Sequence, residues 1–189
     1  MARACRSATG RLAADLKGWG SREWLRMFLD PAQIATDRVW GGTAFVHPPA
    51  GKERADMVDY ILDEIPKFTP EQKRQLERVI VALSAEAQLP AQAAADERDA
   101  AVIEQGRIDF GEKGLNCADC HEFRGTGGGK GPELTGWGSQ EWTQAIVHDP
   151  AHKRFYGRRN DRMQSFGVKR ELSKKQIEML ADWLREVVK

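Results

Sequence analysis

The sequence lacks any long hydrophobic run: no apolar stretch approaches the ~20 residues that a membrane-spanning helix needs. Its first residues, MARACRSATGRLAADLKGW, also lack the apolar centre of a secretory signal. Neither sign of charge prevails, because 29 Lys and Arg stand against 28 Asp and Glu. This balance gives no indication of binding to nucleic acid, so we expect no nucleic-acid partner and no transmembrane segment in this chain.

Cysteine is scarce too. The chain has three, of which Cys117 and Cys120 form a close pair and Cys5 stands alone. An odd number with one close pair is not typical of a disulfide scaffold. No segment alternates apolar and polar residues as a half-buried strand does, so the predicted fold class is all-α. The hydrophobic share of 41% is typical of a globular protein.

An internal repeat is present. LKGWGSREW at 16–24 is closely similar to LTGWGSQEW at 134–142, and both continue to an Asp-Pro pair. The segments 68–86 and 171–188 also share one pattern, in the same order. Ser21, Ser139, Thr69 and Ser173 are each placed to cap a helix. We therefore expect two tandem copies of one helical plan.

A further helix precedes the second copy. Ala101, Val102, Ile108 and Phe110 predict its buried side, and it ends near Gly111 and Gly114. The first copy has no counterpart of this helix.

CADCH at 117–121 carries the chemistry. A C-x-x-C-H motif is a signal for covalent attachment of c-type haem. Cys117 and Cys120 lie on one side of a helical turn, where both thiols can form thioethers with the porphyrin vinyl groups. His121 then offers its imidazole to the iron. Three alternatives stay open: a zinc site, which needs about four ligands, a redox dithiol and an inert pair. The glycine run 125–131 does not match a phosphate-binding loop.

A second axial ligand is expected opposite His121. Methionine paired with histidine is typical of electron-transfer cytochromes c. Met163 lies in the polar segment NDRMQSFG, between predicted helices, and is the candidate. His148 and His152 are the alternatives, and either would give bis-histidine ligation. The candidate pocket residues around the haem are Pro132, Leu134, Trp137, Tyr156 and Phe166.

These features resemble the class I cytochrome c family. The resemblance is carried by CADCH (117–121), GPEL (131–134), RMQSFG (162–167) and the amphipathic terminal helix (173–188). It implies one haem c per chain, with the Pro132 carbonyl accepting a hydrogen bond from His121. It also implies an electron carrier rather than an enzyme. Gln164 stands where the family often has proline after the methionine.

A finer resemblance is to the cytochrome c modules of bacterial quinol–cytochrome c reductase (bc-type) complexes. It implies a place in a respiratory chain, redox partner proteins, a cytochrome b-type membrane subunit as partner, and a periplasmic or other extracytoplasmic location. The alternative functions are a haem enzyme or gas sensor with open or bis-His iron, and a zinc-binding module.

The predicted division of the chain is a first unit at 1–88 without a haem motif, a linker at 89–98 and a mono-haem domain at 99–189. Two explanations of the first unit are open. It is either a degenerate copy that packs on the second, or a copy whose front lies upstream of Met1. The absent export signal favours the second explanation.

The charge is uneven between residues 151 and 175. Cations dominate there: Lys153, Arg154, Arg158, Arg159, Arg162, Lys169, Arg170, Lys174 and Lys175. This segment is either a solvated loop or a docking surface for an acidic partner.

Overall fold

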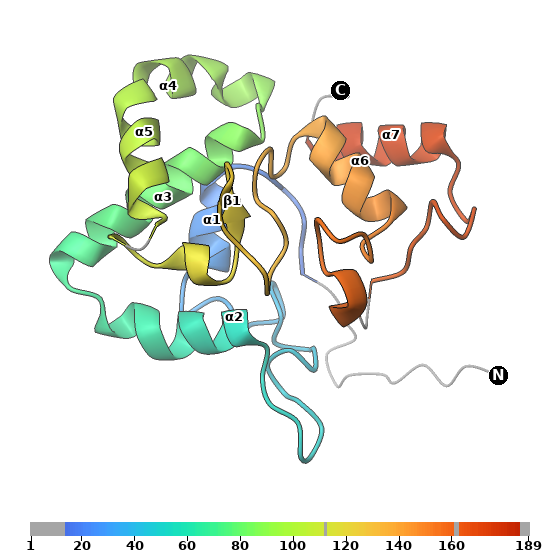
Figure 1. Cartoon of the computed structure of the whole chain (residues 1–189), viewed down its shortest axis with the longest axis horizontal. Helices are drawn as coiled ribbons and strands as arrows, with labels where there is room; N and C mark the ends of the chain where they lie inside the picture. Colours follow the sequence, from blue (N-terminus) through green and yellow to red (C-terminus); the bar gives the residue numbers. More distant parts are fainter. Residues whose placement is uncertain (1–13, 112, 161–162, 186–189) are drawn as a thin grey trace.

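The computed structural model describes residues 14–111, 113–160 and 163–185. Cys5 and Arg162 lie outside the described residues. The described chain is mostly helical, which confirms the predicted all-α class (Figure 1). Its only strands are the two-residue β1 (Glu122–Phe123) and β2 (Thr126–Gly127), which pair antiparallel.

The helices follow the order of the two copies. In the first half they are α1 (Arg22–Phe28), α2 (Asp56–Asp59), the π-helical turn η1 (Tyr60–Glu64), the 3₁₀ turn η2 (Ile65–Lys67) and α3 (Pro70–Glu86). Between the copies lie η3 (Pro90–Gln92), α4 (Ala93–Arg98) and α5 (Ala100–Asp109). The second half holds η4 (Cys117–Asp119), α6 (Gln140–His148), η5 (Gly157–Arg159) and α7 (Lys174–Leu184).

All four predicted helix caps are present. The hydroxyls of Ser21 and Ser139 accept hydrogen bonds from the first turns of α1 and α6. Thr69 and Ser173 begin α3 and α7 with complete capping boxes. A cap supplies an acceptor for a backbone N–H that has no partner inside the helix, so these residues fix where each helix begins.

The repeated segments 16–24 and 134–142 each form a corner that leads into α1 or α6, and each corner has the same hydrogen bond from its tryptophan. The indole Nε1 of Trp24 donates to the Asp15 carbonyl at 2.9 Å, and that of Trp142 donates to the Glu133 carbonyl at 2.8 Å. Asp15 and Glu133 are equivalent positions, each one residue before the repeated leucine. The sequence repeat is therefore also a repeat of local structure.

The two corners pack directly against each other. The rings of Trp19 and Trp137, equivalent residues of the two copies, have centroids 4.7 Å apart. A Cβ on Gly20 or on Gly138 would come within 2.9 Å of Ala87 Cβ. Ala87, which follows α3, can approach both backbones only because these two positions carry no side chain.

Helix α5 packs on α3, the last helix of the first copy, whereas α7 packs on α6 (Figure 1). Gly106 is the point of closest approach, since a Cβ there would lie 2.0 Å from the Arg78 carbonyl oxygen. Arg78 Nε also donates to the buried carboxylate of Asp109 at 2.5 Å. The helix that leads to the C-x-x-C-H motif is thus held by the first half of the chain.

The predicted buried side of α5 is wrong. Ala101 and Val102 are exposed, and Ile108 is 61% exposed. Of the four predicted residues only Phe110, just after the helix, is buried. The side facing the protein instead carries Ile103 and Gly106. The reason is that glycine allows the closest approach of two helix backbones, so Gly106 and not the larger aliphatics determines which face turns inward.

Glu86, at the end of α3, joins the two halves through polar contacts. Its buried carboxylate accepts from Arg124 Nε at 2.8 Å, from the backbone N–H of Gly136 at 2.9 Å and from Arg107 at 3.3 Å. Buried charges are tolerated where cations and N–H groups surround them. These contacts tie α3 to α5, to the β1–β2 hairpin and to the second repeated corner.

Candidate functional site

A single turn positions both thiols and the imidazole. After α5 the chain reverses, with Leu115 N donating to Asp109 O at 2.7 Å, and Asn116 adopts a left-handed conformation at φ 58°. The turn η4 follows, in which the amides of Cys120 and His121 donate to the Cys117 carbonyl at 3.2 and 3.0 Å. Cys117 and Cys120 are free thiols.

The ring of His121 is fixed from one side. Its Nδ1 lies 2.9 Å from the Pro132 carbonyl oxygen. Because a carbonyl can only accept, Nδ1 carries the proton and Nε2 is left with its lone pair. Burial lowers the pKa of His121, and the bond to Pro132 acts in the opposite direction. The neutral ring that a metal ligand requires is therefore favoured.

Gly131 allows this arrangement. A Cβ at that position would lie 2.4 Å from His121 Cε1, so any side chain would displace the ring. The glycine and proline of GPEL therefore have distinct roles: Gly131 gives room for the imidazole, and Pro132 orients it.

The Cys117 side chain is partly buried against the common core. Burial raises its pKa to about 12, with a smaller opposing contribution from hydrogen bonds that include the Tyr60 hydroxyl. Tyr60 comes from the first half of the chain, and its hydroxyl donates to the Leu115 carbonyl at 3.1 Å. Leu115 and Ala118 are buried beside it in the common core. The turn from Cys117 to His121 thus lies against both halves.

The other predicted pocket residues lie in different surroundings. Leu134 is half-buried against the core, and its amide donates to the Glu122 carbonyl at 2.8 Å. Trp137 belongs to the tryptophan contact between the copies. Tyr156 is 39% exposed, and Phe166 is half-buried against the core.

Met163 is half-buried and also packs against the core. Its backbone is held on both sides by one amide side chain, since Asn160 Nδ2 donates to Met163 O at 2.7 Å and Asn160 Oδ1 accepts from Met163 N at 3.2 Å. The alternatives His148 and His152 are both exposed. The His148 ring lies against Gly167, and His152 Nδ1 accepts from the Arg154 amide at 3.3 Å.

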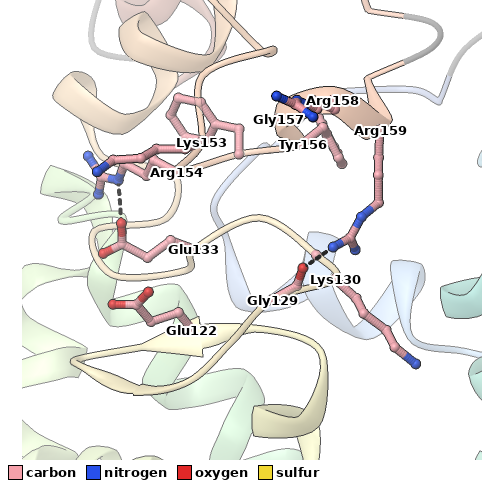
Figure 2. A pocket seen from close by; sticks show the side chains of 12 residues that line it. Glu122, Gly129, Lys130, Glu133, Lys153, Arg154, Tyr156, Gly157, Arg158 and Arg159 are labelled. Carbon is pink, nitrogen blue, oxygen red and sulfur yellow. Dashed lines mark hydrogen bonds and ion pairs between the residues drawn. The ribbon is translucent and has the colours of Figure 1, made fainter.

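A cavity of about 450 Å³ separates the loop that carries Gly131 from the segment 153–159. Figure 2 shows the two walls, with Arg159 reaching the Gly129 carbonyl and Arg154 paired with Glu133. Tyr156 lines the cavity. Gly131 lines this cavity and also lies against the His121 ring.

The donor set fits covalently bound haem. Two free thiols on one turn can form the thioether bonds, and the imidazole presents an unprotonated Nε2 whose ring orientation is set by a backbone carbonyl. Among the described residues, no three His, Cys, Asp or Glu side chains are grouped so that they could hold a metal ion.

Residues 104–187 match the family model for cytochrome c. This cytochrome c segment covers less than half of the chain and contains the whole turn from Cys117 to His121. No curated protein and no solved structure matches the chain. Across the described ranges, no helix has both the length and the apolar character to cross a lipid bilayer.

Sequence reasoning missed two features around the cytochrome c segment. Tyr60 carries no motif signal, and nothing in its surroundings, ADMVDY, indicates contact with a cysteine 57 positions later. Asn160 carries no motif signal either. A hint was available for the loop around it, because Asn is a residue that often bonds to nearby backbone.

Proposed function

We propose that this chain is a c-type cytochrome that carries electrons, with one haem bound through Cys117 and Cys120 and with His121 as axial ligand. The observation that supports it best is the hydrogen bond from His121 Nδ1 to Pro132 O, at 2.9 Å, directly after two free thiols. A structural cysteine pair would not need an oriented, neutral imidazole beside it.

When bound, the haem supplies one-electron exchange between Fe(II) and Fe(III). The chain contributes orientation and environment. Pro132 holds the His121 ring and makes Nε2 a better donor. The buried side chains of Leu115, Ala118 and Phe123 keep water away from the attachment turn, and burial is one of the factors that set a haem potential. A methionine sulfur would complete the ligation, and the sequence predicts Met163 for that place.

The setting we propose is a respiratory chain, with this protein as a module of a quinol–cytochrome c reductase-like complex at an extracytoplasmic membrane face. Its partners would be redox proteins, among them a cytochrome b-type membrane subunit. The exposed cations Lys153, Arg158, Lys169 and Arg170 support a partner with an acidic surface, because charge complementarity speeds encounter.

The test is to express the chain, directed to the periplasm, in a host that attaches haem c. Intact mass should show one added haem, and a Soret band should accompany it. Cys117→Ser with Cys120→Ser should abolish the covalent mass, whereas Cys5→Ser, which replaces the thiol outside the motif, should leave it unchanged. A colourless protein with bound zinc, or rapid carbon monoxide binding to the reduced protein, would contradict an electron carrier.

A further inference from the structure

The backbone reversal that leads into the C-x-x-C-H motif is held by two side chains from the first half of the chain. The reversal is closed by Leu115 N, which donates to Asp109 O at 2.7 Å. At its start, Arg78 Nε donates to the carboxylate of Asp109 at 2.5 Å. At its end, the Tyr60 hydroxyl donates to the carbonyl of Leu115 at 3.1 Å. The first half therefore contacts both ends of the reversal.

The reversal and the residue after it are tight enough to need such support. A Cβ on Gly114 would lie 2.0 Å from the carbonyl oxygen of Asp109. Asn116, which directly precedes the motif, has a positive φ of 58°, a conformation that residues other than glycine seldom adopt. Such conformations persist only where the surrounding structure holds them. Leu115 lies between these two positions, so a hydrogen bond to its carbonyl restrains the backbone of both neighbours.

Tyr60 can supply this restraint because its hydroxyl is protonated and its ring is fixed. Burial is the main cause that raises the pKa of Tyr60, so the hydroxyl remains a donor at neutral pH. The ring packs edge-on against Phe68, with centroids 6.2 Å apart. Tyr60 begins the π-helical turn η1, an irregularity found frequently at functional sites. The same hydroxyl contacts the Cys117 thiol, so one group of the first half reaches both Leu115 and the first cysteine of the motif.

The second cysteine of the motif is held from the other half of the chain. The Cys120 carbonyl accepts hydrogen bonds from the amides of Lys130 at 3.1 Å and of Gly131 at 2.7 Å. Both donors belong to the glycine-rich loop 128–131, which follows the β1–β2 hairpin. The two cysteines thus depend on different parts of the chain for their positions, Cys117 on Tyr60 and Cys120 on this loop.

We propose that Tyr60 is a positioning residue for haem attachment: through the Leu115 carbonyl and the Cys117 side chain it holds the first thiol of the motif in place. The inference rests on the proposed function. Each thioether forms when a thiol S–H adds across a vinyl C=C bond, with sulfur bonding to one carbon and hydrogen to the other, so no oxidant or leaving group is required. Tyr60 acts on the position of the Cys117 sulfur and not on the addition itself. The first half, which has no C-x-x-C-H motif, thereby acts as a template for the motif of the second half.

The experiment compares the full wild-type chain with Tyr60→Phe, which removes only the hydroxyl. Thr36→Val is the matched control, because it removes a first-half hydroxyl that donates to a carbonyl outside the motif, Gln33 O at 2.7 Å. Circular dichroism first establishes the helix content of each protein. Amide hydrogen exchange of the apoprotein then reports how often the turn 117–121 opens. After expression in a host that attaches haem c, peptide mass spectrometry shows which of the two motif cysteines carries haem.

In the apoprotein we expect Tyr60→Phe to raise the exchange rates of the Ala118, Cys120 and His121 amides by about tenfold, the effect of losing one hydrogen bond. Exchange in α6 and α7 should stay unchanged. In the haem-loaded protein, chains bound through Cys120 alone, with a free Cys117, should appear. Thr36→Val should match the wild type in both measurements.

Wild-type exchange rates in the turn of Tyr60→Phe, or attachment at both cysteines as complete as in the wild type, would overturn the proposal. Exchange that accelerates in α6 and α7 as much as in the turn would overturn it too, because that result would show a general loss of stability. Absence of covalent haem from the wild type overturns the proposed function instead. The exchange measurement needs no haem, so it still decides whether Tyr60 holds the turn.

Discussion

The guanidinium of Arg78 and the carboxylate of Asp109 form an ion pair, with a shortest distance of 2.5 Å, that joins α3 to α5. The Asp109 side chain is 5% exposed, whereas that of Arg78 is 25% exposed. The bond to Asp109 is the main cause of the raised pKa of Arg78. This pair links the last helix of the first copy to the helix that precedes the haem motif.

Removing the charge of Asp109 should weaken this link. We expect Asp109→Asn to lower the free energy of unfolding by about 2 kcal/mol, since hydrogen bonds to charged groups typically contribute about 1.5–3 kcal/mol. Urea denaturation followed by circular dichroism measures it. Arg74→Gln is the control, because its pair with Glu71 is exposed and should contribute about 0–1 kcal/mol. Equal effects in both variants would contradict a supporting role for the Asp109 pair.

The contact at Gly106 predicts a larger effect. A Cβ there would overlap the Arg78 carbonyl, so Gly106→Ala should separate α5 from α3 and cost about 3 kcal/mol or more, at the upper end for overpacked sites. The melting temperature and the fraction of protein that incorporates haem should both fall. Gly111→Ala is the matched control, because its Cβ would meet only Ile108 O, at 3.4 Å. An unchanged melting temperature in Gly106→Ala would refute the close packing of α5 on α3 at this glycine.

The carboxylate of Glu86 should matter for the hairpin beside the haem motif. Glu86→Gln keeps the shape and one acceptor but removes the charge opposite Arg107 and Arg124. We expect a loss of about 1.5–3 kcal/mol and faster hydrogen exchange at residues 122–127. Glu104→Gln, at an exposed pair with Arg107, is the comparison and should leave exchange in the hairpin unaltered.

The thiol of Cys117 should react slowly in the apoprotein. Because burial raises its pKa to about 12, little thiolate is present in the folded state at pH 8, and alkylation should accelerate as the pH rises toward that value. In denaturant the pH at which alkylation reaches half its maximal rate should return toward the ordinary thiol pKa of about 8.5. Iodoacetamide labelling followed by peptide mass spectrometry measures both. A folded protein that reacts at the unfolded rate at pH 8 would contradict the raised pKa of Cys117.

The cations between residues 151 and 175 should steer association with an acidic surface. We expect Lys153→Glu with Lys169→Glu to slow electron exchange with a carboxylate-coated electrode and to flatten its dependence on salt. Lys52→Glu with Lys73→Glu makes the same change in net charge at exposed lysines of the first half. If both pairs of substitutions slow exchange equally, net charge and not a local docking surface is responsible.

Local signals in the sequence were sufficient for the helix class, the caps and the repeat. Ser21, Thr69 and Ser173 cap helices by bonding to residues two to four positions away, so their roles can be predicted from the neighbouring sequence. The bond between His121 and Pro132 was also expected, from the family resemblance. These predictions succeed because the interactions span short stretches of chain or follow a motif.

The pairing of α5 with α3 could not be predicted in the same way. Helix periodicity shows that a helix has an apolar side, but not which other helix that side contacts. Glycine carries no hydrophobic signal, so the sequence pattern assigned Ile108 and not Gly106 to the buried face of α5. In the structure Ile108 is exposed. Tyr60 was missed for the same reason, because its partners lie 55 and 57 positions away.

Because α5 packs on α3 before the motif begins, the two halves of the described chain depend on each other for their packing. If the chain were divided at residue 98, the first product would lack α5, which covers α3. The second product would lack α3, against which α5 packs. Any protein that keeps the contact between α5 and α3 therefore has to keep both halves.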